Sequence, residues 1–237
     1  MRGRGIIYSI MILFFNKTLI ICYSTPNYSK LTEISLKSLY NLNIKPENIR
    51  HKLDIPPEKL FEKDTGFMSD LFHYCIIEKV KHLINMLIQN KNKYEYFISL
   101  DLDIWFLENN KHQWNNLKSF IDYNDNDIFF MRENYNDEVN GGFFIIKNKN
   151  IDIIINFLSF IYINLILKTK QELPMLEQQL INENKYQIKY DYIPNEYVIF
   201  GEDIFNQNKS LFHHSVCCRN VDEKIIQINS IKDKFKV

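Results

Sequence analysis

The pair Asp101 and Asp103 is the most informative set of reactive side chains in the sequence. In an extended strand, residues two apart point to the same face, so the two carboxylates should project together. Neighbouring carboxylates repel each other and raise a pKa unless a cation lies between them. Because oxygen ligands suit Mg²⁺ and Mn²⁺, the pair indicates a divalent-metal site. Two solvated loop aspartates are the alternative.

The chain around the pair favours the metal site. Residues 96–106 (YFISLDLDIWF) form a β-rich run, which predicts a central strand with Leu100, Leu102 and Ile104 packed opposite the carboxylates. In open α/β sheets, sites lie at the carboxyl ends of strands. We therefore expect both aspartates at that edge of a sheet.

Two adjacent histidines, His213 and His214, come late in the chain. In an extended segment they cannot point the same way, so at most one of them can join the aspartates. An imidazole nitrogen with two carboxylates is a suitable ligand set for a borderline metal ion. A single histidine is otherwise more often structural or on the surface.

Asn140, Gly141 and Gly142 interrupt the β-rich run 139–146. Glycine weakens a strand, so the two glycines mark either a plain bulge or a place where a ligand approaches the backbone closely. Both interpretations stay open from the residues alone.

Other polar candidates are Lys79, Glu177 and Gln178. Lys79 lies on the apolar stripe of a predicted helix, 70–89, where a lysine either extends along the apolar surface or points toward an anion in a cleft. Glu177 and Gln178 follow a proline and could be only the exposed face of a short helix. Neither alternative is decided by the sequence.

The elements that must position these side chains alternate along the chain. Residues 18–23 (TLIICY) predict a buried strand, and 29–40 predict a helix. This strand-loop-helix opening indicates an α/β fold with a mostly parallel, doubly wound sheet flanked by helices. Further helices are expected at 112–121 and 151–167, and further strands at 128–131 and 139–146.

The length of 237 residues and the lack of repeats or linkers predict one domain, 18–237, after an N-terminal apolar extension, 1–17. Two arginines precede the apolar run 6–15, but no small-residue cleavage site follows and the run is too short to span a bilayer. We expect a dispensable extension, with membrane association as the weaker alternative. The longer run 151–167 is interrupted by polar residues, which favours a buried helix.

Composition excludes other classes of function. Lysine plus arginine equals aspartate plus glutamate at 29 each, so no basic field attracts a nucleic acid. The four cysteines lack a C-x-x-C spacing or a dense framework, which predicts reduced thiols and a cytoplasmic protein. No Walker loop or G-x-G-x-x-G occurs, so a bound diphosphate would need a metal ion.

Four segments, in this order, resemble the GT-A nucleotide-diphospho-sugar transferases. Residues 97–106 (FISLDLDIWF) are similar to the D-x-D strand of that family, and 139–146 (VNGGFFII) to the strand beneath the donor sugar. Residues 177–182 (EQQLIN) resemble its D-Q-x-x-x-N segment, with glutamate in place of aspartate. Residues 212–215 (FHHS), followed by Lys224, resemble its C-terminal histidine segment.

The resemblance implies a single GT-A type, Rossmann-like domain that moves a sugar from a nucleotide-sugar donor to a carbohydrate or glycoconjugate acceptor with retention. It implies Mn²⁺ or Mg²⁺ bound by Asp101, Asp103 and a histidine, with His213 preferred and His214 as the alternate. It places Glu177 and Gln178 at the reacting sugar. The expected donor-binding residues are Tyr23 and Asn27 beside the base, Lys79 near the phosphates, and Asn140 and Gly141 beside the sugar. Asp101 and Lys224 are also expected to bind the donor.

Two other functions stay open. A phosphatase of the haloacid dehalogenase kind also has a strand followed by D-x-D, but there the motif opens the chain and continues with threonine or valine. Here it lies mid-chain and continues into Ile104 and Trp105. The other alternative is a catalytically inactive GT-A domain that binds a carbohydrate or a partner, which the glutamate at 177 favours.

Overall fold

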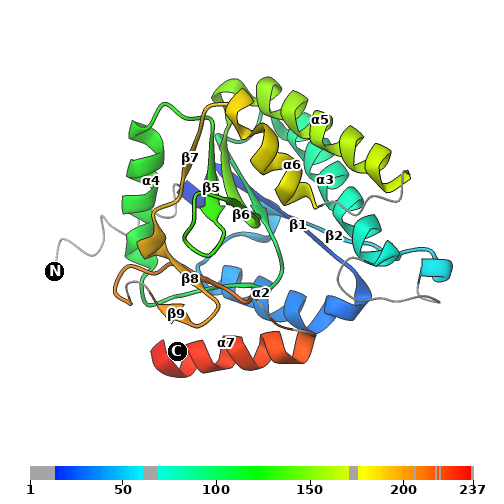
Figure 1. Ribbon diagram of the computed structural model, residues 1–237. Coiled ribbons are helices and arrows are strands. Elements are labelled where there is room, and N and C mark those ends of the chain that lie inside the picture. The colour runs from blue at the N-terminus through cyan, green and yellow to red at the C-terminus, as the bar shows by residue number, and fades with distance from the viewer. Residues whose placement is uncertain are drawn as a thin grey trace.

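A six-stranded sheet in the order β2-β1-β3-β6-β5-β7 forms the centre of the protein (Figure 1). The computed structural model describes residues 14–60, 69–170, 176–204, 207–216, 218 and 220–235. The strands of this sheet are β1 (Thr18–Ser24), β2 (Ile49–Leu53), β3 (Tyr96–Leu100), β5 (Ile128–Arg132), β6 (Val139–Lys147) and β7 (Tyr190–Tyr192). The α/β class predicted from the sequence is confirmed.

The sheet is mostly parallel, and β6 is the exception. β1 pairs in parallel with β2 and with β3, and β5 pairs in parallel with β7. β6 lies antiparallel between β3 and β5, with Phe143 opposite Leu100. The first residues of β6 therefore lie beside the carboxyl end of β3, where the two aspartates follow.

A smaller sheet has the order β4-β10-β8-β9. Its strands are β4 (Ile104–Phe106), β8 (Val198–Phe200), β9 (Asp203–Ile204) and β10 (Phe212–His214). The single strand expected over 96–106 is therefore wrong: β3 ends at Leu100, the backbone turns at 101–103, and β4 joins the other sheet. The turn is closed by the Ile104 N–H, which donates to the Asp101 carbonyl at 3.3 Å.

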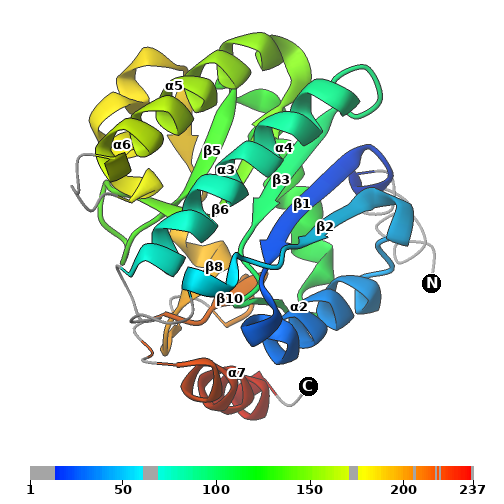
Figure 2. The ribbon, with the colours of Figure 1, turned by 90° about the vertical axis from the view of Figure 1, so that its right-hand side faces the viewer.

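Helices cover both faces of the central sheet (Figures 1 and 2). They are α2 (Ser29–Asn41), α3 (Asp70–Asn90), α4 (Trp114–Tyr123), α5 (Ile151–Lys170), α6 (Glu177–Asn184) and α7 (Val221–Phe235). In β1, Leu19 and Ile21 pack with α3 and α5, whereas Ile20 and Cys22 pack with α2 and α4. This alternation of buried side chains is that of a strand covered on both faces. α7 packs through Ile228 and Ile231 on the smaller sheet.

The packed core begins before β1. Phe14 and Phe15 are buried, and their rings lie 6.2 and 5.0 Å from that of Trp114 in α4. The extension predicted at 1–17 therefore includes two core residues. Aromatic side chains bury large apolar areas, so these two residues contribute to the stability of the fold. The rest of the apolar run, 6–13, lies outside the described residues.

One helix among the described residues, Asn148–Lys170, is long and apolar enough by length and composition to cross a membrane. It contains α5, which packs against α3 and the sheet through residues such as Ile154, Leu158 and Ile161. Only 33% of its most apolar stretch is buried in the protein. Its inner side matches the buried helix predicted for 151–167, whereas Ile153, Ile163 and Leu167 on its outer side are exposed.

Candidate active site

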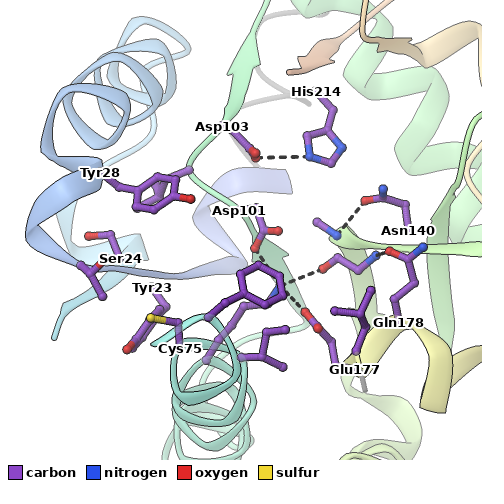
Figure 3. Close-up of a pocket in the computed structure, with 18 of the residues that line it drawn as sticks. Tyr23, Ser24, Tyr28, Cys75, Asp101, Asp103, Asn140, Glu177, Gln178 and His214 are labelled. Atoms are coloured by element: carbon purple, nitrogen blue, oxygen red, sulfur yellow. Dashed lines mark hydrogen bonds and ion pairs between the residues drawn. The ribbon is translucent and has the colours of Figure 1, made fainter. Parts of the chain in front are cut away.

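An open cavity lies where β1 and β3 end and β6 begins (Figure 3). Side chains from α3, α6, β10 and α7 complete its walls. The residues predicted from the sequence that line it are Tyr23, Asn27, Lys79, Asp101, Asp103, Asn140, Gly141, Glu177, Gln178, His214 and Lys224. Segments far apart in the sequence therefore meet in one place, and His213 is the predicted residue that does not line the cavity.

Asp103 lies between His214 and Lys224. Its Oδ1 is 3.2 Å from Nε2 of His214, and its Oδ2 accepts a hydrogen bond from Nζ of Lys224. Burial alone would raise the pKa of Asp103, but Lys224 and His214 outweigh it and hold the pKa far below its usual range. Asp103 is thus an ionised carboxylate at this site.

The two histidines of β10 point in opposite directions, as the alternation of a strand requires. His214 faces Asp103 across the cavity (Figure 3). His213 is buried, and its Nε2 lies 2.8 Å from the carbonyl oxygen of Gly201. Burial lowers the pKa of His213 to about 4. The histidine that reaches the aspartates is therefore His214, rather than the His213 that the resemblance favoured.

Lys79 joins three parts of the site. Its Nζ lies 2.8 Å from Asp101 and 2.7 Å from Glu177, and it donates to the Gly141 carbonyl at 3.3 Å. The lysine on the apolar stripe of α3 therefore points toward anions. Burial would lower the pKa of Lys79, but Asp101 and Glu177 raise it. Burial and the nearby carboxylates of Asp103 and Glu177 in turn raise the pKa of Asp101, despite the ammonium group of Lys79.

A cluster of amide groups forms the other side of the cavity. Asn140 accepts from the Gly142 N–H at 2.8 Å, and Gln178 accepts from the Gly141 N–H at 3.3 Å. The NH₂ groups of Asn140 and Gln178 both donate to Oε2 of Glu133. Glu133 therefore fixes which end of each side-chain amide faces the backbone.

Glu133 was not predicted. It belongs to a polar segment between β5 and β6 that resembles an ordinary solvated loop in the sequence. Its direction depends on the next two residues, Asn134 and Tyr135, whose φ angles of 44° and 62° are in the left-handed region. An asparagine after the acid is a weak signal for such a turn.

The glycines of β6 have different surroundings. A Cβ on Gly142 would lie 2.7 Å from Cε1 of His214, so the ring can pack there only against glycine. A Cβ on Gly141 would lie 3.3 Å from Oε1 of Glu177. The pairing of β5 with β6 also shifts register between Phe130 and Met131, which leaves the glycines in a bulge. The bulge that the sequence offered as one alternative is present, and the side chains of His214 and Glu177 approach its backbone closely.

Comparison with protein families decides the class of protein. The family model of nucleotide-diphospho-sugar transferases matches residues 38–235, which is most of the chain and contains 16 of the 21 residues that line the cavity. The chain belongs to the nucleotide-diphospho-sugar transferase family. It is therefore a glycosyltransferase, as the four segments predicted. A search of curated proteins gave no match.

Solved glycosyltransferases share the fold of this family member. A glycosyltransferase involved in glycosylation of the major capsid of PBCV-1 is 15% identical, with a TM-score of 0.62, over 90% of this chain and 98% of the other. GlyE of Streptococcus pneumoniae TIGR4 is 15% identical, with a TM-score of 0.54, over 92% and 64%. The galactosyltransferase LgtC, in complex with donor and acceptor sugar analogs, is 10% identical, with a TM-score of 0.50, over 89% and 95%.

The alternatives to a transferase receive no support from these comparisons. The family match is to sugar transferases and not to phosphatases. Glu177, the substitution that favoured an inactive domain, is held by Lys79 at the wall of the cavity. Its ion pair and its place in the cavity wall are both compatible with a role in substrate binding or catalysis.

Asp103 and His214 of this transferase fit a divalent cation, although no three His, Cys, Asp or Glu side chains among the described residues form a complete metal cluster. Oδ1 of Asp103 is buried and makes no hydrogen bond within the described part of the chain. It faces Nε2 of His214 at 3.2 Å, and both atoms are common metal ligands. Mg²⁺ in phosphate-binding sites often takes only one or two carboxylates, with substrate phosphates as further ligands.

The end of the cavity where the sequence analysis expects the base is formed by β1 and the 3-10 turn η1 (Pro26–Tyr28). The Tyr23 hydroxyl donates to Asp54 at 2.9 Å, so this tyrosine is fixed by a protein carboxylate. Asn27 is exposed at the rim. Tyr28, which the sequence analysis did not select, also lines this wall, and its ring faces the cavity (Figure 3). The sequence signal that could have identified Tyr28 is its position as an aromatic residue in the loop that follows a strand.

Proposed function

We propose that this glycosyltransferase takes its sugar from a nucleotide-diphosphate donor, requires Mn²⁺ or Mg²⁺, and transfers the sugar with retention to a carbohydrate or glycoconjugate acceptor. The observation that carries the proposal is the facing pair of Asp103 and His214 beside two half-buried lysines, Lys79 and Lys224. Three carboxylates and two ammonium groups meet here, so a negative charge is left over for a cation.

The diphosphate end of the cavity consists of Asp101, Asp103, His214, Lys79 and Lys224. A divalent cation bound by Asp103 and His214, with Asp101 beside them, would neutralise charge on the departing diphosphate. Lys79 and Lys224 now neutralise the aspartates. With a cation bound to the aspartates, these lysines can donate to phosphate oxygens instead, because ammonium groups bind either anion.

The sugar end of the cavity consists of Asn140, Gly141, Glu177 and Gln178, with Glu133 bonded to the two side-chain amides from outside the cavity lining. A retaining transfer needs negative or dipolar groups on the sugar face opposite the diphosphate, since positive charge develops at the anomeric carbon. We assign this role to the Gln178 carbonyl, whose orientation Glu133 fixes. Glu177 is one methylene longer than aspartate, and we assign it to binding a hydroxyl group of the sugar. Its Oε1 also forms an ion pair with Lys79.

The acceptor is assigned to the wall formed by Leu71, Phe72, Ile76 and Leu176, which is the apolar part of the cavity lining. Sugars have apolar faces of C–H groups that pack on such walls, while a few polar groups fix their orientation. We also propose a cytoplasmic location, because Cys22, Cys75 and Cys218 are free thiols.

The test is release of nucleoside diphosphate from a panel of nucleotide sugars, measured on EDTA-treated protein with and without Mn²⁺. Donors carrying galactose belong in the panel because LgtC is a galactosyltransferase. We expect release with at least one donor, and only with the cation. Equal release without any divalent cation would overturn the cation requirement. An inverted anomeric centre in the product, measured by NMR, would overturn retention.

A further inference from the structure

A buried ammonium group lies just after α6, the helix whose first turn lines the cavity. It belongs to Lys185, which begins the 3-10 turn η6 (Lys185–Gln187) and is only 5% exposed. Its Nζ donates to the Asp137 carbonyl at 2.6 Å, to the Tyr192 hydroxyl at 2.7 Å and to Oδ1 of Asn182 at 3.2 Å. An ammonium group has three donors, so all of them are used.

The surroundings of this charge are neutral. Within the described part of the chain, Lys185 forms no ion pair with a carboxylate. Three aromatic rings lie near its Nζ instead, at 5.7, 5.6 and 5.4 Å, and they belong to Tyr186, Tyr190 and Tyr192. Ring faces attract a cation, but a buried charge without an opposite charge is still costly, and apolar side chains that replace buried charged groups are often neutral or stabilising. The charge of Lys185 is therefore better explained by what it positions than by stability.

Asn182 connects the ammonium group to the first residue of β6. Its Oδ1 accepts from the Val139 N–H at 2.8 Å, and its Nδ2 donates to the Val139 carbonyl at 3.2 Å. The same Nδ2 donates to the backbone carbonyl of Gln178, one turn earlier in α6, at 3.0 Å. Because Lys185 can only donate, it keeps the oxygen of the Asn182 amide, and not its nitrogen, toward the Val139 N–H. Lys185 therefore fixes how α6 and β6 meet.

The Asp137 carbonyl connects the same ammonium group to the turn at 133–138. The two arms of this turn are joined by the Glu133 N–H, which donates to the Glu138 carbonyl at 2.8 Å. Two residues inside the turn have φ angles in the left-handed region, and such a conformation persists only where the surroundings hold it. Lys185 holds one arm, while Glu133 on the other arm orients the side-chain amides of the cavity.

We propose that Lys185 is a positioning residue for the transfer. Its ammonium group holds α6 and the start of β6 in the arrangement in which the Gln178 side chain reaches the Gly141 N–H. The proposal rests on the role proposed above for Gln178 at the reacting sugar. Lys185 is not among the residues that line the cavity, so it acts only through the groups that it binds.

The variant Lys185→Met tests this role, because methionine is also long and unbranched but carries no charge and no donor. The Asp137 carbonyl still accepts from the Tyr192 hydroxyl in this variant, so this buried oxygen keeps a partner. We expect kcat to fall about 10-fold with little change in the KM for the donor. The melting temperature should stay the same or rise, since a buried charge is removed. A purely structural lysine would give the opposite result, which is a lower melting temperature and an unchanged kcat.

Amide hydrogen exchange at Gly141, followed by NMR, measures the positioning without any turnover. This N–H donates to the side chain of Gln178 at 3.3 Å, and we expect it to exchange about 10-fold faster in Lys185→Met. Lys147→Met is the matched control. Lys147 also donates to two backbone carbonyls, but it lies at the other end of β6 and outside the cavity lining. Its substitution should leave kcat and the exchange of Gly141 unchanged.

Combining Lys185→Met with Gln178→Ala completes the experiment. Lys185→Met should lower kcat little further in the Gln178→Ala background, since both changes remove the same interaction. Additive losses of kcat, an unchanged kcat in Lys185→Met, or an unchanged exchange rate at Gly141 would overturn the proposal. Normal turnover in Gln178→Ala alone is the separate failure of the role proposed for Gln178. The exchange rate at Gly141 then still decides whether Lys185 positions the two elements.

Discussion

The two ends of the cavity are built from different chemistry. At the end proposed for the diphosphate, Asp101 and Asp103 are neutralised by Lys79 and Lys224, so each carboxylate has a partner that a bound cation can replace. At the end proposed for the sugar, Gln178 is held by the Gly141 backbone and by Glu133, in hydrogen bonds that fix direction. One end is suited to exchanging ions, and the other to holding a geometry.

Removing a charge from the diphosphate end should have the largest effect. Asp103→Asn is expected to lower cation-dependent turnover by about 10³-fold or more, because a neutral amide cannot replace the charge at similar shape. Calorimetric titration of Mn²⁺ with the nucleoside diphosphate should show no cation-dependent binding. Asp125→Asn, at an exposed aspartate paired with Lys149 and Lys189, is the matched control. Unchanged cation-dependent binding in Asp103→Asn would show that this carboxylate is not a ligand.

At the sugar end, Gln178→Ala is expected to lower kcat by about 10²-fold while the affinity for the nucleoside diphosphate changes little. An interaction that matters mainly in the transition state behaves in this way. Steady-state kinetics and calorimetry separate the two quantities. Gln187→Ala, at an exposed glutamine outside the cavity, should be close to the wild type. Normal turnover in both Gln178→Ala and Glu177→Ala would remove this pair from the mechanism.

The neighbouring histidine that lies outside the cavity should affect stability and not catalysis. His213 has a pKa of about 4 in the fold, below the usual value of 6.5, so the unfolded chain binds its proton first and stability falls as pH drops below about 6.5. Between pH 7 and pH 5 this costs on the order of 2 kcal/mol. Urea unfolding at both pH values should show this loss in the wild type.

The variant His213→Gln isolates that contribution, because glutamine keeps a donor for the Gly201 carbonyl and does not titrate. Its loss of stability between the two pH values should be smaller than that of the wild type by the same amount. Identical losses in both proteins would mean that another group is responsible.

The smallest effect is expected from Glu133, which acts through Gln178 and Asn140. Glu133→Ala should lower kcat by about 10-fold with little change in the KM for the donor, since the side-chain amides lose their orientation but not their identity. Glu133→Gln should be intermediate, because its carbonyl oxygen can still accept from both NH₂ groups, as Oε2 does, but a neutral amide is a weaker acceptor than a carboxylate.

A double-mutant cycle distinguishes orientation from a structural role for Glu133. If Glu133 works by orienting Gln178, then Glu133→Ala should cost little more in a Gln178→Ala background. Additive losses of kcat, or a lowered melting temperature in Glu133→Ala alone, would contradict the orienting role.

The features that sequence predicted are those that depend on neighbours along the chain. The alternation of strands and helices and the position of Lys79 on the apolar stripe of its helix follow from local periodicity. Periodicity left open whether Lys79 extends along the apolar surface or points toward an anion, and its contacts with Asp101 and Glu177 show the second. These residues meet in one cavity, as four separate segments had indicated.

The features that were missed depend on residues distant in sequence. β4 belongs to a different sheet from β3 because Phe106 pairs with Phe212 in the smaller sheet. The local pattern of residues 96–106 does not indicate this partner. The direction of His214 likewise depends on which face of β10 meets the cavity. Glu133 is aimed by two left-handed backbone residues, which periodicity does not reveal.

The turn at 101–103 also connects the two sheets. The Asp101 N–H donates to Gly142 of the central sheet at 2.7 Å, whereas the Asp103 carbonyl accepts from Ser215, beside the smaller sheet, at 3.0 Å. The two carboxylates are therefore carried by a three-residue segment that is hydrogen-bonded to both sheets, so a shift of one sheet against the other would change their separation. A ligand that bridges these carboxylates stiffens the whole molecule across this turn, so slower amide hydrogen exchange in β8 and β10 would report donor loading without any turnover.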